Sequence, residues 1–429
     1  MVTYKISKSS IQGNIVVPPS KSQTMRAILF GTLGTGRTQI SNYLPSPDAQ
    51  AMIHAGRLLG AKIQVKPQNS LEIEGLNGQI STVEDVIQAG NSGIVLRFVA
   101  AIAALSPHYT VITGDHSIRH NRPIKTLLDA LTQLGAFAIS TRGDGYAPIV
   151  IRGPLIHQEA VLDGRDSQPV SALLIAAALR NKPTTIIVTD PGEKPWVFLT
   201  LDWFNRLGIP YSNDSYERFE LSGNSKIRGF DYTVPADLSS AAFPIAAAVI
   251  TNSELTLQNI NMNDAQGDKA FVFFLQTMGA RIEIDEVNNT LTVKPGGSLE
   301  GMEIDINSFI DALPIMAVVS CFAKGETRIV NAGIAREKES DRLHAIATEL
   351  QKMGADIQEL PDGLIIRESK LKGNALYSHN DHRIAMALAV AALGATGETA
   401  IDAAECVSKT FPDFASIFHS LGAQIEVVE

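Results

Sequence analysis

Hydrophobic and polar positions follow one pattern that recurs six times along the chain. Each copy closes with apolar residues at helical spacing, then a glycine, then a short alternating strand pattern. A glycine just past a helix end adopts the left-handed C-cap conformation without steric cost. The six turn glycines are 68 to 75 residues apart and are Gly60, Gly135, Gly208, Gly279, Gly354 and Gly422. This regular period predicts a chain built from six copies of one unit.

A second apolar pattern precedes the closing helix of each copy. It is a run of small and branched apolar residues after a short polar start, which is typical of a helix buried on all sides. We expect the polar start to supply the N-cap, because Ser, Asn and Asp are the preferred residues there. The starts are Ser22, Ser92, Ser167, Ser239, Asp311 and Asp381. The predicted unit is a strand, a buried helix, a strand, an amphipathic helix and a strand.

Composition and charge restrict the class of protein. Hydrophobic residues at 45% and charged residues at 19% indicate a globular chain. The formal net charge of −9 disfavours nucleic acid or an anionic membrane as partner. Cys321 and Cys406 form no disulfide framework or metal-thiolate spacing, which suits a reducing cytoplasm. No targeting pattern is visible, and no apolar run reaches the roughly 20 residues that span a bilayer. We expect a cytoplasmic monomer that binds small molecules.

The six units without a linker predict two domains of three units each. We place the first domain at residues 20–234 and the second at 1–19 plus 235–429. Helix N-termini present unpaired N–H groups and a partial positive charge. If three of them point inward from each domain, the cleft between the domains becomes a site for an anion.

Cations stand at several of these helix starts, where they oppose the helix dipole. Lys21 and Arg383 are examples, and a bound anion would explain their placement. Further charges gather between Arg336 and Arg342, at Arg122, and at Lys409 ahead of the last helix. The alternative is that such residues are only helix caps and solvated charges.

Eight runs, taken together in order and spacing, resemble the 5-enolpyruvylshikimate-3-phosphate synthase family of enolpyruvyl transferases over essentially the whole chain. They are PSKSQTMRA, GNSGIVLRF, NRPI, DSQ, FIDALPI, REKESDRL, DHRIAMA and SKTFPDF. The resemblance implies an α/β fold, a two-domain inside-out barrel of six βαβαββ repeats with the active site in the interdomain cleft. It also implies transfer of the enolpyruvyl group of phosphoenolpyruvate to the 5-hydroxyl of shikimate 3-phosphate, with release of phosphate. This addition and elimination belongs to the shikimate pathway to chorismate and aromatic amino acids, and needs no cofactor or metal.

The same resemblance assigns catalytic roles to four residues. Lys21 would contact phosphoenolpyruvate and the reacting hydroxyl, and Asp311 would be the base near that hydroxyl. Glu339 would protonate the methylene carbon and later remove a proton from it, with His382 beside that carbon. A carboxyl closed into a dry cleft can supply such an acid, because burial favours its neutral form.

The resemblance also implies the ligand-binding residues. Phosphoenolpyruvate would be bound by Lys21, Asn91, Gly93, Arg122, Gln168, Arg342, Arg383 and Lys409. Shikimate 3-phosphate would be bound by Lys21, Ser22, Arg26, Ser167, Gln168, Asp311 and Lys338. Arg26 would pair with the shikimate carboxylate through two hydrogen bonds.

Two acidic residues depart from the family pattern at the phosphate site. Asp166 and Glu193 stand where the family usually has serines. A carboxylate about 5 Å from a phosphate charge costs about 3 kcal/mol at an effective dielectric constant of about 20. Three explanations stay open: a cation such as Lys194 or Lys338 compensates, the side chains turn away, or the acceptor is an unphosphorylated alcohol.

Two further alternatives are disfavoured. The relative that acts on UDP-N-acetylglucosamine carries a reactive cysteine in a mobile loop, and the corresponding run GDHSIRHNRP has none. A non-catalytic repeat scaffold would not explain why Lys21, Asp311, Glu339 and His382 all match the family. The family is the target of glyphosate, and Ile94 and Phe98 replace smaller residues beside Gly93, so we expect altered sensitivity.

Overall fold

The computed structural model describes residues 2–429 and contains six four-stranded sheets within them. All six sheets share one strand order. The first strand of a repeat lies parallel to the second, the second antiparallel to the fourth, and the fourth antiparallel to the third. The predicted inside-out barrel of six βαβαββ repeats is therefore confirmed, and it forms two compact units.

The first domain, Lys21–Val234, holds three repeats. The first consists of β14 (Asp231–Thr233), α1 (Lys21–Leu33), β3 (Arg37–Ser41), α2 (Pro47–Leu58), β4 (Lys62–Lys66) and β5 (Ser70–Glu74). The second consists of β6 (Ile87–Gln88), α3 (Gly93–Ala103), β7 (Thr110–Thr113), α4 (His116–His120), α5 (Lys125–Gln133), β8 (Phe137–Ser140) and β9 (Ile149–Arg152). The third consists of β10 (Glu159–Asp163), α6 (Ser167–Leu179), β11 (Thr184–Thr189), α7 (Lys194–Leu207), β12 (Ser212–Asp214) and β13 (Arg218–Leu221).

The second domain comprises Pro235–Glu429 and the N-terminal segment that ends at Ser20. The fourth repeat consists of β2 (Gly13–Val16), α8 (Leu238–Ile250), β15 (Leu255–Gln258), the 3-10 helix η1 (Gly267–Lys269), α9 (Ala270–Met278), β16 (Arg281–Asp285) and β17 (Thr290–Lys294). The fifth consists of β18 (Glu303–Asp305), η2 (Asn307–Ala312), α10 (Leu313–Ser320), β19 (Glu326–Val330), η3 (Gly333–Glu337), α11 (Arg342–Lys352), β20 (Asp356–Leu360) and β21 (Gly363–Arg367). The sixth consists of β22 (Ala375–Tyr377), α12 (His382–Gly394), β23 (Glu398–Asp402), η4 (Ala404–Lys409), α13 (Phe414–Ser420), β24 (Gln424–Val428) and β1 (Thr3–Ser7).

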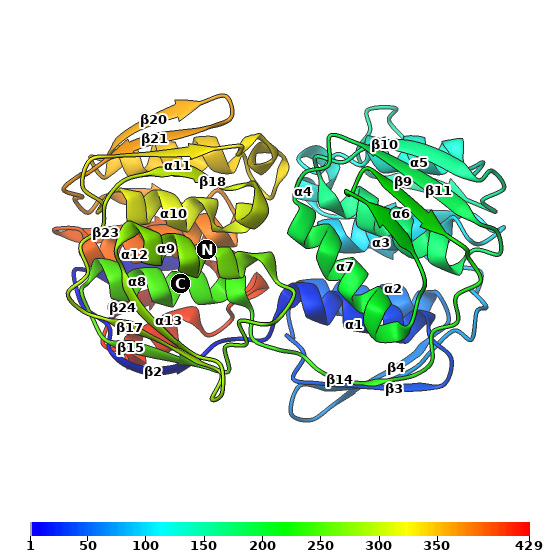
Figure 1. Ribbon diagram of the computed structural model, residues 1–429, viewed down its shortest axis with the longest axis horizontal. Coiled ribbons are helices and arrows are strands. Elements are labelled where there is room, and N and C mark those ends of the chain that lie inside the picture. Colours follow the sequence, from blue (N-terminus) through cyan, green and yellow to red (C-terminus); the bar gives the residue numbers. More distant parts are fainter. Residues whose placement is uncertain (1) are drawn as a thin grey trace. The chain divides into compact units, whose positions relative to one another are not determined.

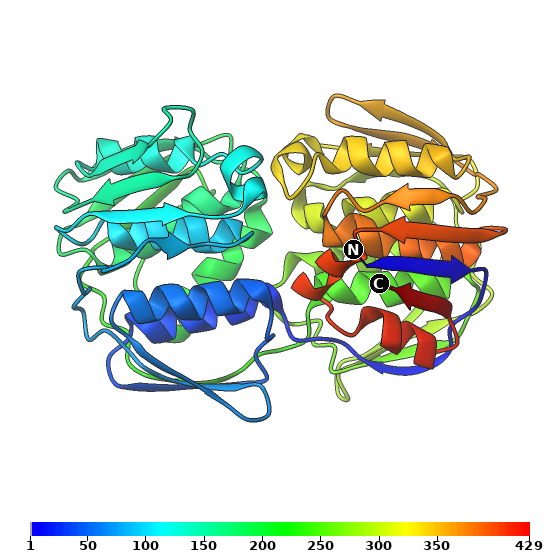
Figure 2. The same ribbon diagram turned by 180° about the vertical axis from the view of Figure 1, so that it is seen from behind.

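Three repeats take one strand from a distant part of the chain. Strand β14 pairs with β3 in the first repeat, and β2 pairs with β15 in the fourth. Figure 2 shows the third case, β1 in blue between β23 and β24. In each domain, at least one four-stranded sheet is therefore completed by a strand that is far away in the sequence.

The buried helices lie inside each domain and the sheets lie outside them (Figure 1). Helices α3 and α6 pack together in the first domain, as do α10 and α12 in the second. Nearly every residue of these helices is buried, whereas the strands alternate buried and exposed positions. Each domain has its own hydrophobic core. This is expected when one face of each sheet packs on the central helices and the other face meets solvent.

The turn glycines behave as predicted. All six have a positive φ, between 68° and 112°. This backbone region penalises side chains with a Cβ atom, which explains why glycine recurs at the end of each amphipathic helix.

The predicted N-caps are right at two helices. The Ser92 hydroxyl accepts a hydrogen bond from the Val95 N–H at 3.3 Å, at the start of α3. The Asp381 carboxylate accepts one from the Arg383 N–H at 2.9 Å, at the start of α12.

The prediction is wrong at the other four helices. Asp166 caps α6 in place of Ser167, and Asp237 caps α8 in place of Ser239. In both cases a carboxylate one or two residues earlier reaches the exposed N–H groups, and a charged acceptor binds them more strongly than a hydroxyl. Ser22 is the second residue of α1, and Asp311 lies in η2 ahead of α10.

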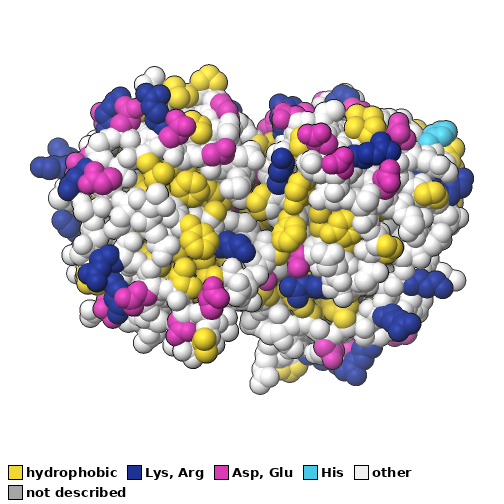
Figure 3. Space-filling view, in the orientation of Figure 1, with side chains coloured by type: hydrophobic (Ala, Val, Ile, Leu, Met, Phe, Trp, Pro, Cys, Tyr) yellow, Lys and Arg dark blue, Asp and Glu magenta, His cyan; other side chains and the backbone are white. Residues whose placement is uncertain are grey.

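The surface carries both signs of charge. On the face shown in Figure 3, Lys and Arg side chains are interspersed with Asp and Glu, and no broad basic area forms there. Among residues 2–429, no helix combines the length and apolar character needed to cross a membrane.

Candidate active site

Arg26 is a buried cation that has no acidic partner in the described part of the chain, residues 2–429. It is 3% exposed and donates to the Thr200 hydroxyl from Nε at 3.1 Å and from Nη2 at 3.0 Å. Its other hydrogen bonds go to the backbone oxygens of Trp196, at 3.2 Å, and Ser22, at 3.3 Å. Among residues 2–429, no carboxylate forms an ion pair with it, and burial lowers its pKa to about 9. A buried guanidinium of this kind is favourable only if an anion joins it.

A buried hydrogen-bond donor of a neighbouring residue, Trp196, also has no acceptor among residues 2–429. The indole Nε1 of Trp196 is buried and has no hydrogen-bond partner among residues 2–429. The Phe98 ring lies 5.4 Å from Arg26 Cζ, a cation–π distance. Phe98 therefore supports the guanidinium, while Ile94 is buried one helical turn earlier in α3.

Arg97, on α3, connects the starts of α3 and α6 in the first domain. Its Nη1 donates to Gln168 Oε1 at 2.8 Å, and its Nη2 lies 3.1 Å from Asp166 Oδ2. A Cβ atom on Gly93 would lie 2.7 Å from Arg97 Nη1, 3.1 Å from Gln168 Oε1 and 3.4 Å from Arg122 Nη1. Glycine at the first position of α3 therefore allows these polar side chains to converge on the backbone.

The two acidic departures at the expected phosphate site have different partners. Asp166 pairs with Arg97, which is 1% exposed, so its charge is compensated within the domain. Glu193 is also 1% exposed and accepts hydrogen bonds from the Ser167 N–H, at 2.9 Å, and the Ser167 hydroxyl, at 2.8 Å. The protein's own carboxylate thus occupies donors at the N-terminus of α6, a position that favours anions.

The other predicted residues of the first domain lie at or just before further helices. Lys21 and Ser22 begin α1, and Asn91 directly precedes the cap of α3. Arg122, 4% exposed, stands between α4 and α5. Lys21, Ser22 and Asn91 thus lie at the starts of buried helices, as the sequence predicted, whereas Arg122 lies ahead of the amphipathic helix α5.

Arg342 is the centre of the second cluster, which lies in the second domain. Its guanidinium donates to Asp381 Oδ2, Asp311 Oδ1 and Glu339 Oε2, each at 2.8 Å. Burial lowers its pKa, but Asp381, Glu339 and Asp311 outweigh this and raise the pKa above its ordinary value. Arg342 is the first residue of α11. The cation that the sequence singled out at this helix start therefore lies beside three acids.

Two further cations hold the same acids. Arg383 Nη2 donates to Asp311 Oδ2 at 2.8 Å, and Lys409 Nζ donates to Glu339 Oε1 at 2.9 Å. Asp311 thus lies between two guanidinium groups, and Glu339 between a guanidinium and an ammonium group. The cluster can exchange these internal acids for the anionic groups of a ligand.

His382 and Lys338 lie close to this cluster in the chain. His382, 1% exposed, follows the cap of α12, and its Nδ1 lies 3.7 Å from Asp381 Oδ1. Lys338, 7% exposed, directly precedes Glu339. The second domain therefore brings together its predicted catalytic residues Asp311, Glu339 and His382.

The second domain also holds Asp268, a buried acid that the sequence analysis did not single out. Asp268 in η1 is 1% exposed and accepts a hydrogen bond from the Ser239 hydroxyl at 2.5 Å. Nothing in the sequence distinguishes it, because its burial and its contact with Ser239 depend on packing within the second domain.

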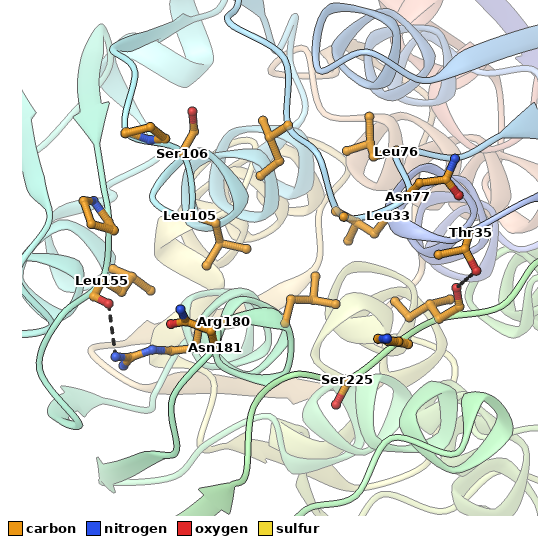
Figure 4. A pocket seen from close by; sticks show the side chains of 17 residues that line it. Leu33, Thr35, Leu76, Asn77, Leu105, Ser106, Leu155, Arg180, Asn181 and Ser225 are labelled. Atoms are coloured by element: carbon orange, nitrogen blue, oxygen red, sulfur yellow. Dashed lines mark hydrogen bonds between the residues drawn. The ribbon is translucent and has the colours of Figure 1, made fainter.

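A separate hollow lies at the other end of the buried helices of the first domain. Leu33 and Leu105, near the C-terminal ends of α1 and α3, line a cavity of about 560 Å³ together with Leu179 (Figure 4). Helix C-termini carry a partial negative charge and disfavour anions. The cavity is therefore distinct from the helix starts that hold the basic residues.

Comparison with known proteins identifies relatives over the full length. The family model described as EPSP synthase (3-phosphoshikimate 1-carboxyvinyltransferase) matches residues 6–418. A 3-phosphoshikimate 1-carboxyvinyltransferase from Acetivibrio thermocellus is 45% identical, over 99% of this chain and 99% of that protein. One from Chlamydia caviae is 46% identical, over 99% of this chain and 95% of its own length.

A solved structure supports the same relationship. The EPSP synthase from Acinetobacter baumannii superimposes with a TM-score of 0.84 and is 26% identical, with both chains covered completely. Sequence and fold thus point to the same set of relatives.

Proposed function

Because the chain belongs to the EPSP synthase (3-phosphoshikimate 1-carboxyvinyltransferase) family, we propose that its two clusters act on one pair of substrates. The enzyme transfers the enolpyruvyl group of phosphoenolpyruvate to the 5-hydroxyl of shikimate 3-phosphate and releases phosphate. This reaction leads to chorismate and the aromatic amino acids. Both substrates are anions, and both clusters are built around buried cations.

The observation that carries the proposal is the isolated charge of Arg26. Among residues 2–429, this buried guanidinium is bonded only to uncharged oxygens. A ligand carboxylate can supply the missing counter-ion and accept two hydrogen bonds from it if it replaces one of those oxygens. The shikimate carboxylate fills this role. Lys21, Ser22, Ser167, Gln168 and Lys338 complete the acceptor site around the ring, the hydroxyl and the phosphate.

Phosphoenolpyruvate binds to the remaining cations in this proposal. Arg342, Arg383 and Lys409 release the acids that they now hold and take the ligand's carboxylate and phosphate, with Arg122 and Lys21 from the other domain. Asn91 and Gln168 add neutral hydrogen bonds. Gly93 keeps the backbone at the start of α3 open to close approach.

Glu339 becomes an acid through this exchange. In the free enzyme, the two cations at Glu339 favour its charged form, since each lies within 2.9 Å. When phosphoenolpyruvate takes Arg342 and Lys409, the carboxyl loses both partners and its affinity for a proton rises. It then delivers a proton to the methylene carbon, beside His382, and accepts a proton back during elimination.

Asp311 is the base in the addition step. It removes the proton of the 5-hydroxyl as the oxygen attacks the central carbon of phosphoenolpyruvate, with Lys21 stabilising the developing charge. Release of Arg383 and Arg342 to the ligand frees the oxygens of Asp311 for this role. Elimination of phosphate from the tetrahedral intermediate then restores the enolpyruvyl double bond.

We also propose that the enzyme acts as a cytoplasmic monomer. Cys321 and Cys406 are free thiols, as expected in a reducing compartment. Each domain buries a core of its own. Light scattering of the purified chain tests the monomer, since a mass near 46.1 kDa supports it and twice that mass contradicts it.

The direct test of the Arg26 role is calorimetric titration with shikimate 3-phosphate. Arg26→Gln should weaken binding about 30-fold, because a charged hydrogen-bonded pair contributes about 2 kcal/mol. The exposed Arg218→Gln variant is the matched control and should bind like the unaltered protein. Equal affinity of all three proteins would overturn the assignment of Arg26.

A further inference from the structure

Asp268 is a buried carboxyl group with one unused oxygen. Its Oδ2 accepts the Ser239 hydroxyl hydrogen bond at 2.5 Å, whereas its Oδ1 has no hydrogen-bond partner among residues 2–429. The residue is 1% exposed. An ionised carboxylate in this state is costly, and a proton on Oδ1 removes the cost.

The charges around Asp268 come from several packed elements. Asp237 stands at the start of α8, Asp311 in η2 and Arg383 in α12, and all three act on its titration. On its own segment, Asp264 lies earlier, and Lys269 donates to the backbone oxygens of Met262 and Asp264. Helix α9, which follows, contributes no titratable side chain.

The balance of these effects favours the neutral form near neutral pH. Burial raises the pKa of Asp268 most, Asp311 and Asp237 raise it further, and Arg383 and the Ser239 hydrogen bond lower it, to about 7 overall. The helix η1 packs against α8 and against η2, which holds Asp311. Arg383 reaches this place by its hydrogen bond to Asp311 at 2.8 Å.

We propose that Asp268 is a positioning residue whose protonation controls how strongly Arg383, paired with Asp311, attracts an anionic ligand. This inference rests on the proposed function. Neutral Asp268 leaves the positive charge of Arg383 available to an anionic ligand. Ionised Asp268 adds a negative charge behind Arg383 and weakens its hold on phosphoenolpyruvate. Binding of phosphoenolpyruvate therefore favours uptake of one proton from solvent onto Oδ1.

The test is the pH profile of kcat/KM for phosphoenolpyruvate, with shikimate 3-phosphate saturating. Asp268→Asn is neutral at every pH and keeps an oxygen for Ser239. We expect the unaltered enzyme to equal this variant at pH ~6 and to fall roughly three- to tenfold below it by pH ~8.5. Titration of the phosphate of phosphoenolpyruvate is common to both proteins and cancels in the ratio.

Two further variants separate this role from a structural one. Ser239→Ala removes a hydrogen bond that favours the charged form, so the fall should move to higher pH. Glu349→Gln alters another buried acid of the same domain and should leave the pH at which the fall occurs unchanged. A ratio between the unaltered enzyme and Asp268→Asn that is constant across pH would overturn the proposal.

An inactive enzyme would overturn the proposed function, and a binding measurement would then decide the role of Asp268. The readout is the rise in Tm caused by phosphoenolpyruvate alone. A rise that shrinks between pH ~6.5 and pH ~8.5 in the unaltered protein, but not in Asp268→Asn, supports the proposal. Equal behaviour of the two proteins, or no rise in either, contradicts it.

Discussion

Glu193 accepts hydrogen bonds from both the backbone N–H and the hydroxyl of Ser167, at 2.9 Å and 2.8 Å. The pair joins the start of α7 to the start of α6, and Glu193 itself has a φ of 44°. A side-chain carboxylate thus fills donors that the proposed acceptor site needs for a phosphate. In the proposed complex, the Glu193 carboxylate and the phosphate of shikimate 3-phosphate therefore compete for the N-terminus of α6.

This competition predicts the behaviour of Glu193→Gln. The amide is a weaker acceptor and carries no charge, so KM for shikimate 3-phosphate should fall about tenfold while kcat changes little. The exposed Glu217→Gln variant serves as control. A KM that is unchanged or higher in Glu193→Gln would mean that Glu193 moves away from the phosphate on binding.

Loss of Arg97 should expose the charge of Asp166. Arg97 is 1% exposed and pairs with Asp166 at 3.1 Å, so Arg97→Met leaves a carboxylate without its counter-ion. We expect the free energy of unfolding in urea to fall by about 3 kcal/mol. The double variant Arg97→Met with Asp166→Asn should recover part of this loss, and additive effects of the two changes would argue against the pair.

Gly93→Ala should affect phosphoenolpyruvate more than shikimate 3-phosphate. The added Cβ would lie 2.7 Å from Arg97 Nη1 and 3.1 Å from Gln168 Oε1, so both side chains must shift. Because these atoms are the tips of flexible side chains, the fold should tolerate the change. Steady-state kinetics should show KM for phosphoenolpyruvate raised about tenfold, with KM for shikimate 3-phosphate as internal reference. Equal changes in both constants would contradict the placement.

Glu339→Gln should bind the substrates without turning them over. The amide keeps the size of the side chain but cannot deliver the proton, and kcat should fall about 10³-fold. Glu337→Gln, an exposed neighbour two residues earlier, should retain full activity. Near-normal turnover by Glu339→Gln would remove Glu339 from the role of proton donor.

The stability of the free enzyme should report the proton on Asp268. Its pKa in the folded state, about 7, lies above the ordinary value of 3.8, so the folded state binds more protons between these two values. The contribution to stability is therefore lost as pH rises through that window and stays constant above it. Asp268→Asn lacks this loss, and its Tm relative to the unaltered enzyme should increase from pH ~5 to pH ~8. A relative Tm that does not change with pH would show that Asp268 does not titrate there.

The repeat and its turns could be read from the sequence because they depend on local backbone preferences. The glycines from Gly60 to Gly422 need only their own left-handed conformation. The exchange of β1, β2 and β14 among repeats could not be read, since each pairs with a strand far away in the chain. The local pattern therefore predicts the repeating unit, whereas the strands that complete three of the sheets are known only from the structure.

Site residues divide in the same way. Lys21, Arg342 and Arg383 stand out in the sequence as cations at helix starts. The partners of Asp166 and Glu193 depend on contacts that are not local in sequence. Arg97, the partner of Asp166, lies in the preceding repeat, and Ser167, the partner of Glu193, lies 26 residues earlier in the same repeat. Asp268 gave no sequence signal of its own, because its role depends on burial and on neighbours from α8, η2 and α12.

The measurement that tests the account most directly is phosphate release from phosphoenolpyruvate, with shikimate 3-phosphate and unphosphorylated shikimate as rival acceptors. We expect turnover with shikimate 3-phosphate and a kcat/KM that is lower by a factor of about 100 or more with shikimate, because the phosphate contributes charged hydrogen bonds. Preference for shikimate, or no phosphate release with either acceptor, would contradict it.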